Sequence, residues 1–172
     1  MSENNRLLLW AVLLVISVTA VADHQAGWPV GSVRIQEGVT VVIINDRNES
    51  ITLHGQDESV DLTAGTYRID SWTMDRFGRD GSAWELKGTD LGKKGVFEVA
   101  NGGGIKLSIG EPIISSLSVR KEGSTYCVTH SFGGQLSETV EITRNGSRPD
   151  APKLEIRNAD GSYQETLTFG YG

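Results

Sequence analysis

Residues 113–132 read Ile113-Ile-Ser-Ser-Leu-Ser-Val-Arg-Lys-Glu-Gly-Ser-Thr-Tyr-Cys-Val-Thr-His-Ser-Phe132. Apolar and polar side chains alternate on both sides of Glu122-Gly123, and alternation with a period of two is typical of a β-strand. The glycine supplies the positive φ that a tight hairpin turn needs. The stretch therefore predicts two antiparallel strands, from Ile113 to Lys121 and from Ser124 to Phe132.

The same pattern recurs along most of the chain. Short alternating segments lie between Gly, Asn and Asp turns, and no helical periodicity longer than about two turns interrupts them. Val39 to Ile44 form a continuous apolar run, which favours a strand buried on both faces. Further strands are expected at 139–144, 153–158 and 163–171, and Ser147–Pro152 is expected to cross between sheets. The sequence thus predicts an all-β fold, an antiparallel β-sandwich.

A domain boundary is predicted at Gly110-Glu-Pro112, because proline cannot donate to a strand ladder and glycine relaxes the backbone. Two packed Ig-like or prealbumin-like sandwiches are favoured. Residues 23–110 would form the first, and residues 111–172 a smaller C-terminal β domain packed on it. One large sandwich is the alternative. Within the first domain, Asn101–Gly104 is expected to be a flexible hairpin.

The chain begins like a secretory signal peptide. A polar start ending at Arg6 precedes an apolar run, Leu7 to Val18, and the triplet Ala20-Val-Ala22. The run is shorter than the roughly 20 residues that cross a bilayer. We therefore interpret residues 1–22 as a signal peptide cleaved after Ala22, with an uncleaved N-terminal membrane anchor as the alternative. A secreted or periplasmic protein without a membrane span after cleavage is expected.

Charge and cysteine content narrow the function classes. The net charge is −6, and no basic run interleaves with aromatic residues, so nucleic acid is excluded as a partner. Cys127 is the one cysteine, so no internal disulfide can form. We expect its thiol to be a small buried side chain in a strand.

No catalytic pattern is present in the sequence. It contains no G-x-S-x-G nucleophile elbow and no Gly-rich phosphate loop that opens a helix. His24, His54 and His130 are too far apart to show metal-ligand spacing. We therefore expect no catalytic residues, no metal and no cofactor, and the protein is predicted not to be an enzyme.

The candidate binding residues lie in Ser71-Trp-Thr-Met-Asp-Arg-Phe-Gly-Arg-Asp-Gly-Ser-Ala-Trp84. Its acidic residues are separated by arginines, which does not fit a calcium loop. One hypothesis is a turn between two strands, and the other is a platform whose aromatic rings stack on a sugar. The candidate ligand-binding residues are Trp72, Asp75, Arg76, Phe77, Arg79 and Asp80. Exposure separates the hypotheses, because a platform leaves Trp72 or Phe77 in water and a scaffold buries both.

Short segments resemble known families. Leu62-Thr-Ala-Gly-Thr-Tyr67 resembles a strand junction of prealbumin-like and collagen-adhesin B-type repeats of secreted bacterial proteins, in which the Gly makes the turn and the Tyr enters the core. Residues 148–154, 158–161 and 169–172 are similar to the ends of uncharacterised exported bacterial β-sandwich proteins. The resemblance implies an exported β-sandwich module and transfers no catalytic residue.

These observations favour an exported, non-enzymatic β-sandwich module with a binding, accessory or surface-presentation role. The alternative is a carbohydrate-binding module that uses the aromatic residues of the 72–84 loop. The expected partner is an unidentified protein or polysaccharide. Unpaired β edges also favour self-association, because such an edge is a template for another strand.

Overall fold

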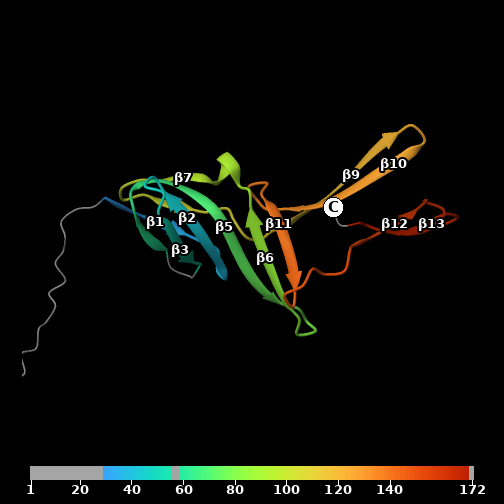
Figure 1. Ribbon diagram of the computed structural model, residues 1–172, viewed down its shortest axis with the longest axis horizontal. Helices are drawn as coiled ribbons and strands as arrows, with labels where there is room; N and C mark the ends of the chain where they lie inside the picture. Colours follow the sequence, from blue (N-terminus) through green and yellow to red (C-terminus); the bar gives the residue numbers. More distant parts are fainter. Residues whose placement is uncertain (1–28, 56–58, 171–172) are drawn as a thin grey trace, which may run out of the picture.

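The computed structural model describes residues 29–55 and 59–170 of the chain (Figure 1). Within those ranges the chain forms thirteen strands and one short 3₁₀ helix, η1 (Gly92–Gly95). The prediction of an all-β fold with antiparallel sheets packed as a sandwich is confirmed. The predicted signal peptide lies outside the described residues.

The strands form three sheets. The largest has the order β3 (Ser50–His54), β2 (Val39–Asn45), β5 (Gly65–Phe77), β6 (Ala83–Thr89), β11 (Thr139–Arg144), β10 (Thr125–Gly133) and β9 (Ile114–Glu122), with β7 (Val96–Val99) beside one end of β5. The second has the order β4 (Val60–Thr63), β1 (Val30–Arg34) and β8 (Gly104–Lys106). The third contains β12 (Lys153–Arg157) and β13 (Gln164–Thr168). β8 runs parallel to β1, and the other pairings recorded for the described strands are antiparallel.

The glycine-rich segment Asn101–Gly104 does not close a hairpin, so that prediction is wrong. β7, before it, pairs with β5, whereas β8, after it, pairs with β1. The segment therefore carries the chain from one sheet to the other. The backbones approach closely at this crossing, because a Cβ on Gly31 of β1 would overlap the carbonyl oxygen of Ala100.

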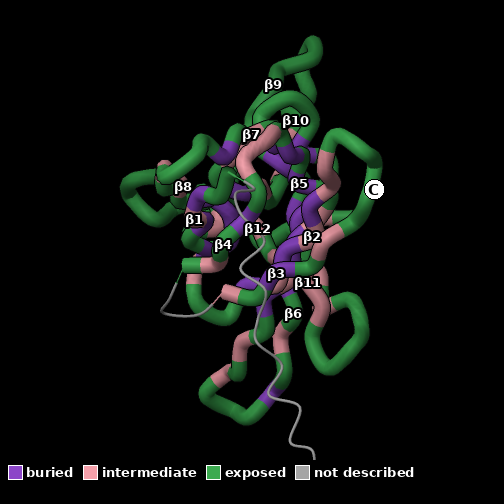
Figure 2. The backbone as a smooth tube through the Cα atoms, turned by 90° about the vertical axis from the view of Figure 1, so that its left-hand side faces the viewer, coloured by how far each residue is buried: buried purple, intermediate pink, exposed green. Residues whose placement is uncertain are grey.

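The hydrophobic core belongs almost entirely to the residues before 110. In β2, Val39, Val41 and Ile43 are buried, whereas Val42 and Ile44 on the other face are half-buried. The apolar run of β2 is thus fully buried on one face, not on two as predicted. Of the described apolar side chains beyond residue 110, Val140 is the one that is buried. Figure 2 shows the buried residues gathered in the packed sheets and the β9–β10 hairpin exposed.

A β-bulge in β5 changes which side chains face the core. The register between β5 and β2 shifts at Asp70, which inserts one extra residue and reverses the alternation. Tyr67 and Ile69 before the bulge, and Trp72 and Met74 after it, are all buried. The bulge therefore allows both halves of a long strand to contribute to the same core.

Most of the chain beyond residue 110, other than β11, extends away from the packed sheets (Figure 1). β11 pairs with β6 along its length and so belongs to the large sheet. β10 pairs with β11 only at Gly133 and Thr139, and then continues outward with β9 as a long hairpin. Residues 147–152 lead from β11 to the separate hairpin of β12 and β13, as expected for a crossing between sheets.

We call the two outer hairpins, residues 114–133 and 153–168, the C-terminal arm. Residues 29–110 together with β11 are the body. The five strands predicted beyond residue 110 are all present as β9 to β13. β11 follows the predicted boundary and β6 precedes it, yet the two strands pair; the division into two domains stays a prediction.

Candidate functional site

The loop with the candidate binding residues is a hairpin of β5 and β6, and its turn lies at residues 78–82. Successive strand residues point to opposite faces of a sheet. Trp72 and Arg76 therefore lie on one face of β5, whereas Asp75 and Phe77 lie on the other. The predicted residues do not form one continuous surface.

Trp72 is part of the core and not of a binding surface. Its side chain is 1% exposed, so a ligand cannot stack on its ring. Its Nε1 donates a hydrogen bond of 2.9 Å to Oε1 of Glu138. Gly88 of β6 packs directly against the ring, where a Cβ would overlap Nε1. This burial removes Trp72 from the candidate set, because a sugar platform needs an accessible ring.

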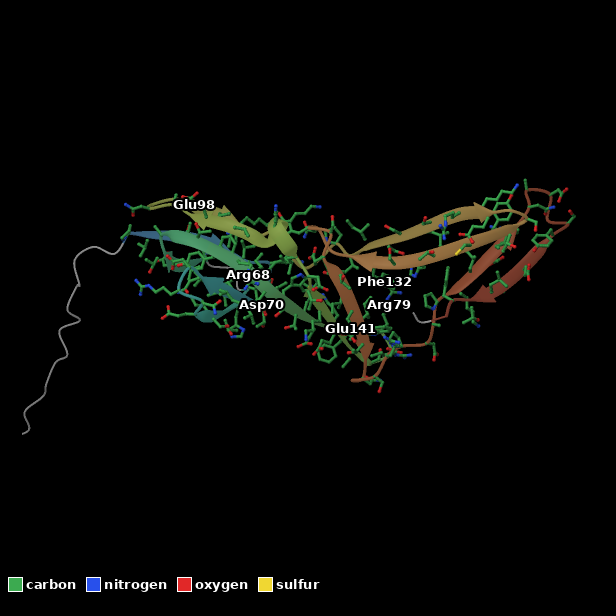
Figure 3. The ribbon with its side chains drawn as sticks, turned by 45° about the horizontal axis from the view of Figure 1, so that its top comes forward. Arg68, Asp70, Arg79, Glu98, Phe132 and Glu141 are labelled. Atoms are coloured by element: carbon green, nitrogen blue, oxygen red, sulfur yellow. The ribbon has the colours of Figure 1, made fainter. Side chains whose placement is uncertain are left out.

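Phe77 is the exposed aromatic residue of the predicted platform. It is 81% exposed, and Asp75 lies on the same face of β5. Arg76 lies on the opposite face, where its Nη2 forms an ion pair of 2.9 Å with Glu111. Arg79 lies exposed in the turn (Figure 3). Phe77 and Asp75 therefore share an exposed face of β5, and Arg79 is exposed in the turn beyond them.

Asp80 stabilises the turn of this hairpin. It accepts hydrogen bonds from the hydroxyl (2.6 Å) and the backbone N–H (3.1 Å) of Ser82, and one of 2.6 Å from Nη2 of Arg144. The Ser82 hydroxyl and N–H, and then Arg144, lower the pKa of Asp80 from 3.8 to about 2. Because these donors occupy the carboxylate, Asp80 connects the turn to β11 instead of presenting a free acceptor.

Trp84 lies opposite Arg144 of β11. Its Nε1 donates a hydrogen bond of 2.9 Å to the Ser82 hydroxyl, and the Arg144 guanidinium lies 5.5 Å from its ring centroid. Its ring is half-buried and also lines a cavity.

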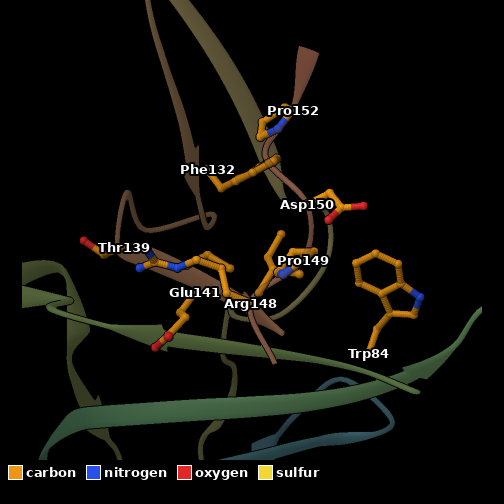
Figure 4. Close-up of a pocket in the computed structure, with 10 residues that line it drawn as sticks. Trp84, Phe132, Thr139, Glu141, Arg148, Pro149, Asp150 and Pro152 are labelled. Atoms are coloured by element: carbon orange, nitrogen blue, oxygen red, sulfur yellow. The ribbon is translucent and has the colours of Figure 1, made fainter. Parts of the chain in front are cut away.

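This cavity, of about 600 Å³, lies at the fork where β10 leaves β11. Trp84, Phe132, Pro149 and Pro152 contribute apolar surface to it, and Asp150 contributes a carboxylate (Figure 4). The volume falls within the roughly 300–1,000 Å³ of small-molecule sites. Sequence reasoning missed this cavity, although the proline-containing crossing segment was recognised. The sequence did not indicate that residues 147–152 fold back over Trp84 and so enclose the cavity.

Glu138 is a second residue that sequence reasoning missed. It lies in the turn between β10 and β11 and is 1% exposed. Its Oε1 accepts from Nε1 of Trp72, and its Oε2 accepts from the N–H of Leu136, both at 2.9 Å. Gly134 leaves room for the carboxylate, because a Cβ there would overlap Oε1. Glu138 therefore connects the root of the arm to β5 of the body.

The arm exposes apolar side chains on its two hairpins. In β9 and β10, Leu117 lies opposite His130, Val119 opposite Val128, and Lys121 opposite Tyr126. Directly opposed residues share a face, so these side chains form one largely apolar surface. The exposed fractions are 54% for Leu117, 59% for Val119 and 62% for Tyr126.

The hairpin of β12 and β13 presents a similar face. Ile156, Tyr163 and Leu167 are 37%, 48% and 43% exposed, and alternation places them on one side of the hairpin. Phe169 follows on the same side, and its ring centroid lies 5.4 Å from that of His130. The two apolar faces are therefore turned toward each other at the root of the arm and are open to solvent beyond it.

One further prediction concerns the cysteine. Cys127 is exposed, not buried as predicted, because its face of the β9–β10 hairpin has no layer over it. In the described ranges, no group of three or more His, Cys, Asp or Glu residues could hold a metal ion. The described residues also contain no helix long and apolar enough to cross a membrane.

Comparison of the chain with protein-family models, with curated proteins and with solved structures finds no match in any of the three. The family resemblances therefore stay predictions. Tyr67 is buried, and its hydroxyl donates a hydrogen bond of 2.7 Å to the carbonyl of Thr63.

Proposed function

We propose that the protein is an exported, non-enzymatic binding module in which the body is a scaffold and the C-terminal arm is the contact surface. The observation that carries this proposal is the exposure of six large apolar side chains on the facing sides of the two hairpins. They are Leu117, Val119, Tyr126, Ile156, Tyr163 and Leu167. Contiguous apolar surface of this kind marks interaction sites on soluble proteins.

The chemistry of the arm favours a protein partner. β9 is the last strand of the large sheet, and β12 and β13 each pair only with the other. Among the described strands these therefore have one unpaired edge each. An unpaired edge offers backbone donors and acceptors to an incoming strand, and a neighbouring apolar face gives that strand side-chain contacts.

A second candidate function is the binding of a carbohydrate or another small polar ring compound. The cavity at the fork supports it, because it combines the ring of Trp84 with the carboxylates of Glu141 and Asp150. Soluble polysaccharides titrated against tryptophan fluorescence would test this candidate. A response lost in Trp84→Ala but kept in Phe77→Ala would place the site in the cavity, and the reverse would place it on the β5–β6 hairpin.

Site-specific photo-crosslinking tests the main proposal. A photoreactive amino acid at Val119, on the apolar face of β9, is compared with one at Thr129, on the opposite face of the hairpin and away from the free edge of β9, in the full chain produced in an exporting host. We expect discrete adducts from position 119 and few from position 129. Absence of adducts at position 119, or equal labelling at both positions, would contradict the arm as a contact surface.

A further inference from the structure

We propose that the partner of the arm is a second copy of this chain, paired antiparallel along the free edge of β9 about a two-fold axis at Ser118. This inference rests on the proposed role of the arm as a contact surface. It goes further, because it names the occupant, the strand and the register.

The direction of the peptide groups determines which residues of β9 have N–H and C=O groups free to pair with another strand. The N–H of Gly134 donates a hydrogen bond of 3.0 Å to the carbonyl of Glu138, on the β11 side of β10. Peptide groups point alternately to the two edges of a strand. The odd-numbered residues of β10 therefore face β9, where they pair with even-numbered residues without a break in register. It follows that the odd-numbered residues of β9, including Leu117 and Val119, turn their N–H and C=O groups to the free edge.

One register suits this edge best. β9 is a strand of nine residues, Ile114–Glu122, and Ser118 is its centre. Two copies paired about Ser118 therefore overlap along the whole strand, with their outward peptide groups opposite each other. Leu117 of each copy then lies opposite Val119 of the other, an apolar cross-strand pair that occurs twice.

The charges of β9 agree with the same register. Arg120 lies opposite Ser116 of the second copy, Lys121 lies opposite Ser115, and Glu122 lies opposite Ile114. No two like charges are therefore opposed, and such oppositions destabilise a sheet.

Other centres are less favourable. An axis at Arg120 or at Lys121 would set that cation opposite its own copy. An axis at Val119 would set Leu117 against Lys121, and an axis at Leu117 would set Val119 against Ser115 over a shorter overlap. The alternation of polar and apolar residues in β9 thus selects one pairing.

The pairing would also join the apolar faces of the two copies into one surface. A two-fold axis perpendicular to the joined sheet keeps both apolar faces on the same side. The strands β10, β9, β9 and β10 of the two copies then form one layer, with both β12–β13 hairpins over it. The six partly exposed side chains leave on the order of 500 Å² of apolar surface per copy, before backbone groups are counted. A standard interface buries about 800 Å² per partner, so the available area suits a reversible dimer.

Disulfide trapping tests the register. Directly opposed residues of a non-hydrogen-bonded pair have Cα atoms about 4.5 Å apart, and disulfides need roughly 4.4–6.8 Å. In a Cys127→Ser background, Ser118→Cys is expected to form a covalent dimer under mild oxidation. Ser116→Cys is the matched control, because its two copies would lie about 13 Å apart along the strands. Equal cross-linking of both variants, or of neither, would overturn the proposal.

Sedimentation and hydrogen exchange test the same interface without added cysteines. We expect the wild-type protein to dimerise with rising concentration, and Val119→Lys to remain a monomer because its cation would face Leu117. Amide exchange at Leu117 and Val119 should slow as the dimer forms, whereas exchange at Ser116 and Ser118 should not change.

A wild-type protein that stays monomeric at all concentrations, or a dimer whose Leu117 and Val119 amides stay unprotected, would overturn self-pairing. Adducts with a different protein from a photoreactive group at Val119 would also contradict the second copy, but they would leave the arm as a contact surface. Absence of adducts of either kind would contradict both proposals.

Discussion

β2 in the body and β9 in the arm are both strands of an antiparallel sheet, but they differ in how many neighbours they pair with and in how far their side chains are buried. β2 pairs with β3 on one edge and β5 on the other, and its inward side chains are buried. β9 pairs only with β10, and all of its residues are exposed. The difference shows that alternation and a turn are sufficient to specify a hairpin. Burial also requires a second layer, which the arm has only at its root.

The largest expected effect is a difference in the free energy of unfolding lost by a substitution in the body and by one in the arm. Trp72→Ala removes a buried ring and leaves Oε1 of Glu138 without its donor, so it should destabilise the protein by about 3–5 kcal/mol. Tyr126→Ala, in the arm, should change the free energy of unfolding by no more than about 0.5 kcal/mol. Urea denaturation at low protein concentration measures both. Similar losses in the two variants would show that the arm shares the stability of the body.

Glu138 tests the connection between the two regions. Glu138→Ala leaves the Nε1–H of Trp72 and the N–H of Leu136 without their acceptor, at about 1–3 kcal/mol for each buried group. Glu141→Ala, an exposed glutamate in the neighbouring strand, is the control and should be near neutral. If Glu138→Ala proves as mild as its control, the carboxylate does not hold the turn to β5.

Leu167→Ala should have a smaller effect that is confined to the arm. Leu167 pairs with Leu154 in a two-stranded sheet, an arrangement that is marginally stable by itself. The urea midpoint should hardly move, within about 0.5 kcal/mol, whereas amide exchange in β12 should become faster. A clear loss of global stability would mean that β12 and β13 unfold together with the body.

The smallest effect concerns two turns of the same sequence, Asp80-Gly-Ser82 in the body and Asp160-Gly-Ser162 in the arm. Hydrogen bonds from Ser82 lower the pKa of Asp80 to about 2, and the backbone N–H and hydroxyl of Ser162 lower the pKa of Asp160. Ser82→Ala should raise the Asp80 pKa toward 3.8 and leave that of Asp160 unchanged, as NMR titration can measure.

The sign of the pH dependence follows from that shift. Because the folded pKa of Asp80 is lower than the unfolded value, its contribution to stability is present above pH 3.8 and is lost as the pH falls to about 2. Ser82→Ala should reduce the difference in stability across this pH window. An Asp80 pKa that stays at about 2 in Ser82→Ala would show that the backbone N–H of residue 82 and Arg144 are sufficient to lower it.

Sequence patterns predicted the strands well where turn chemistry marks their ends. Gly123, Gly146 and Gly161 all have positive φ, and β9 to β13 lie where those turns and the alternation place them. The role of Trp72 could not be predicted, because the bulge at Asp70 shifts the alternation by one residue. A bulge depends on pairing with β2, which the local sequence does not contain.

The candidate site was harder to predict than the fold, for a related reason. Glu138 is an isolated acidic residue in a polar turn, and its burial depends on where Trp72 and Gly134 lie in space. Alternation also identified which side chains of β9 and β10 share a face. It could not indicate whether another layer covers that face, because covering depends on the path of residues 147–152.

The close contact of Gly88 with Trp72 restricts the order in which substitutions could accumulate in this chain. Any side chain at Gly88 would overlap the indole ring, whereas a smaller residue at position 72 would relieve that overlap. Descendants of this sequence could therefore replace Gly88 only after Trp72, and the reverse mutational path would pass through a poorly folded intermediate. Glu138 depends on Trp72 in the same way, because its Oε1 accepts a hydrogen bond from the Trp72 indole, and this bond is lost when Trp72 is replaced. Three positions far apart in the chain would thus change as a linked group.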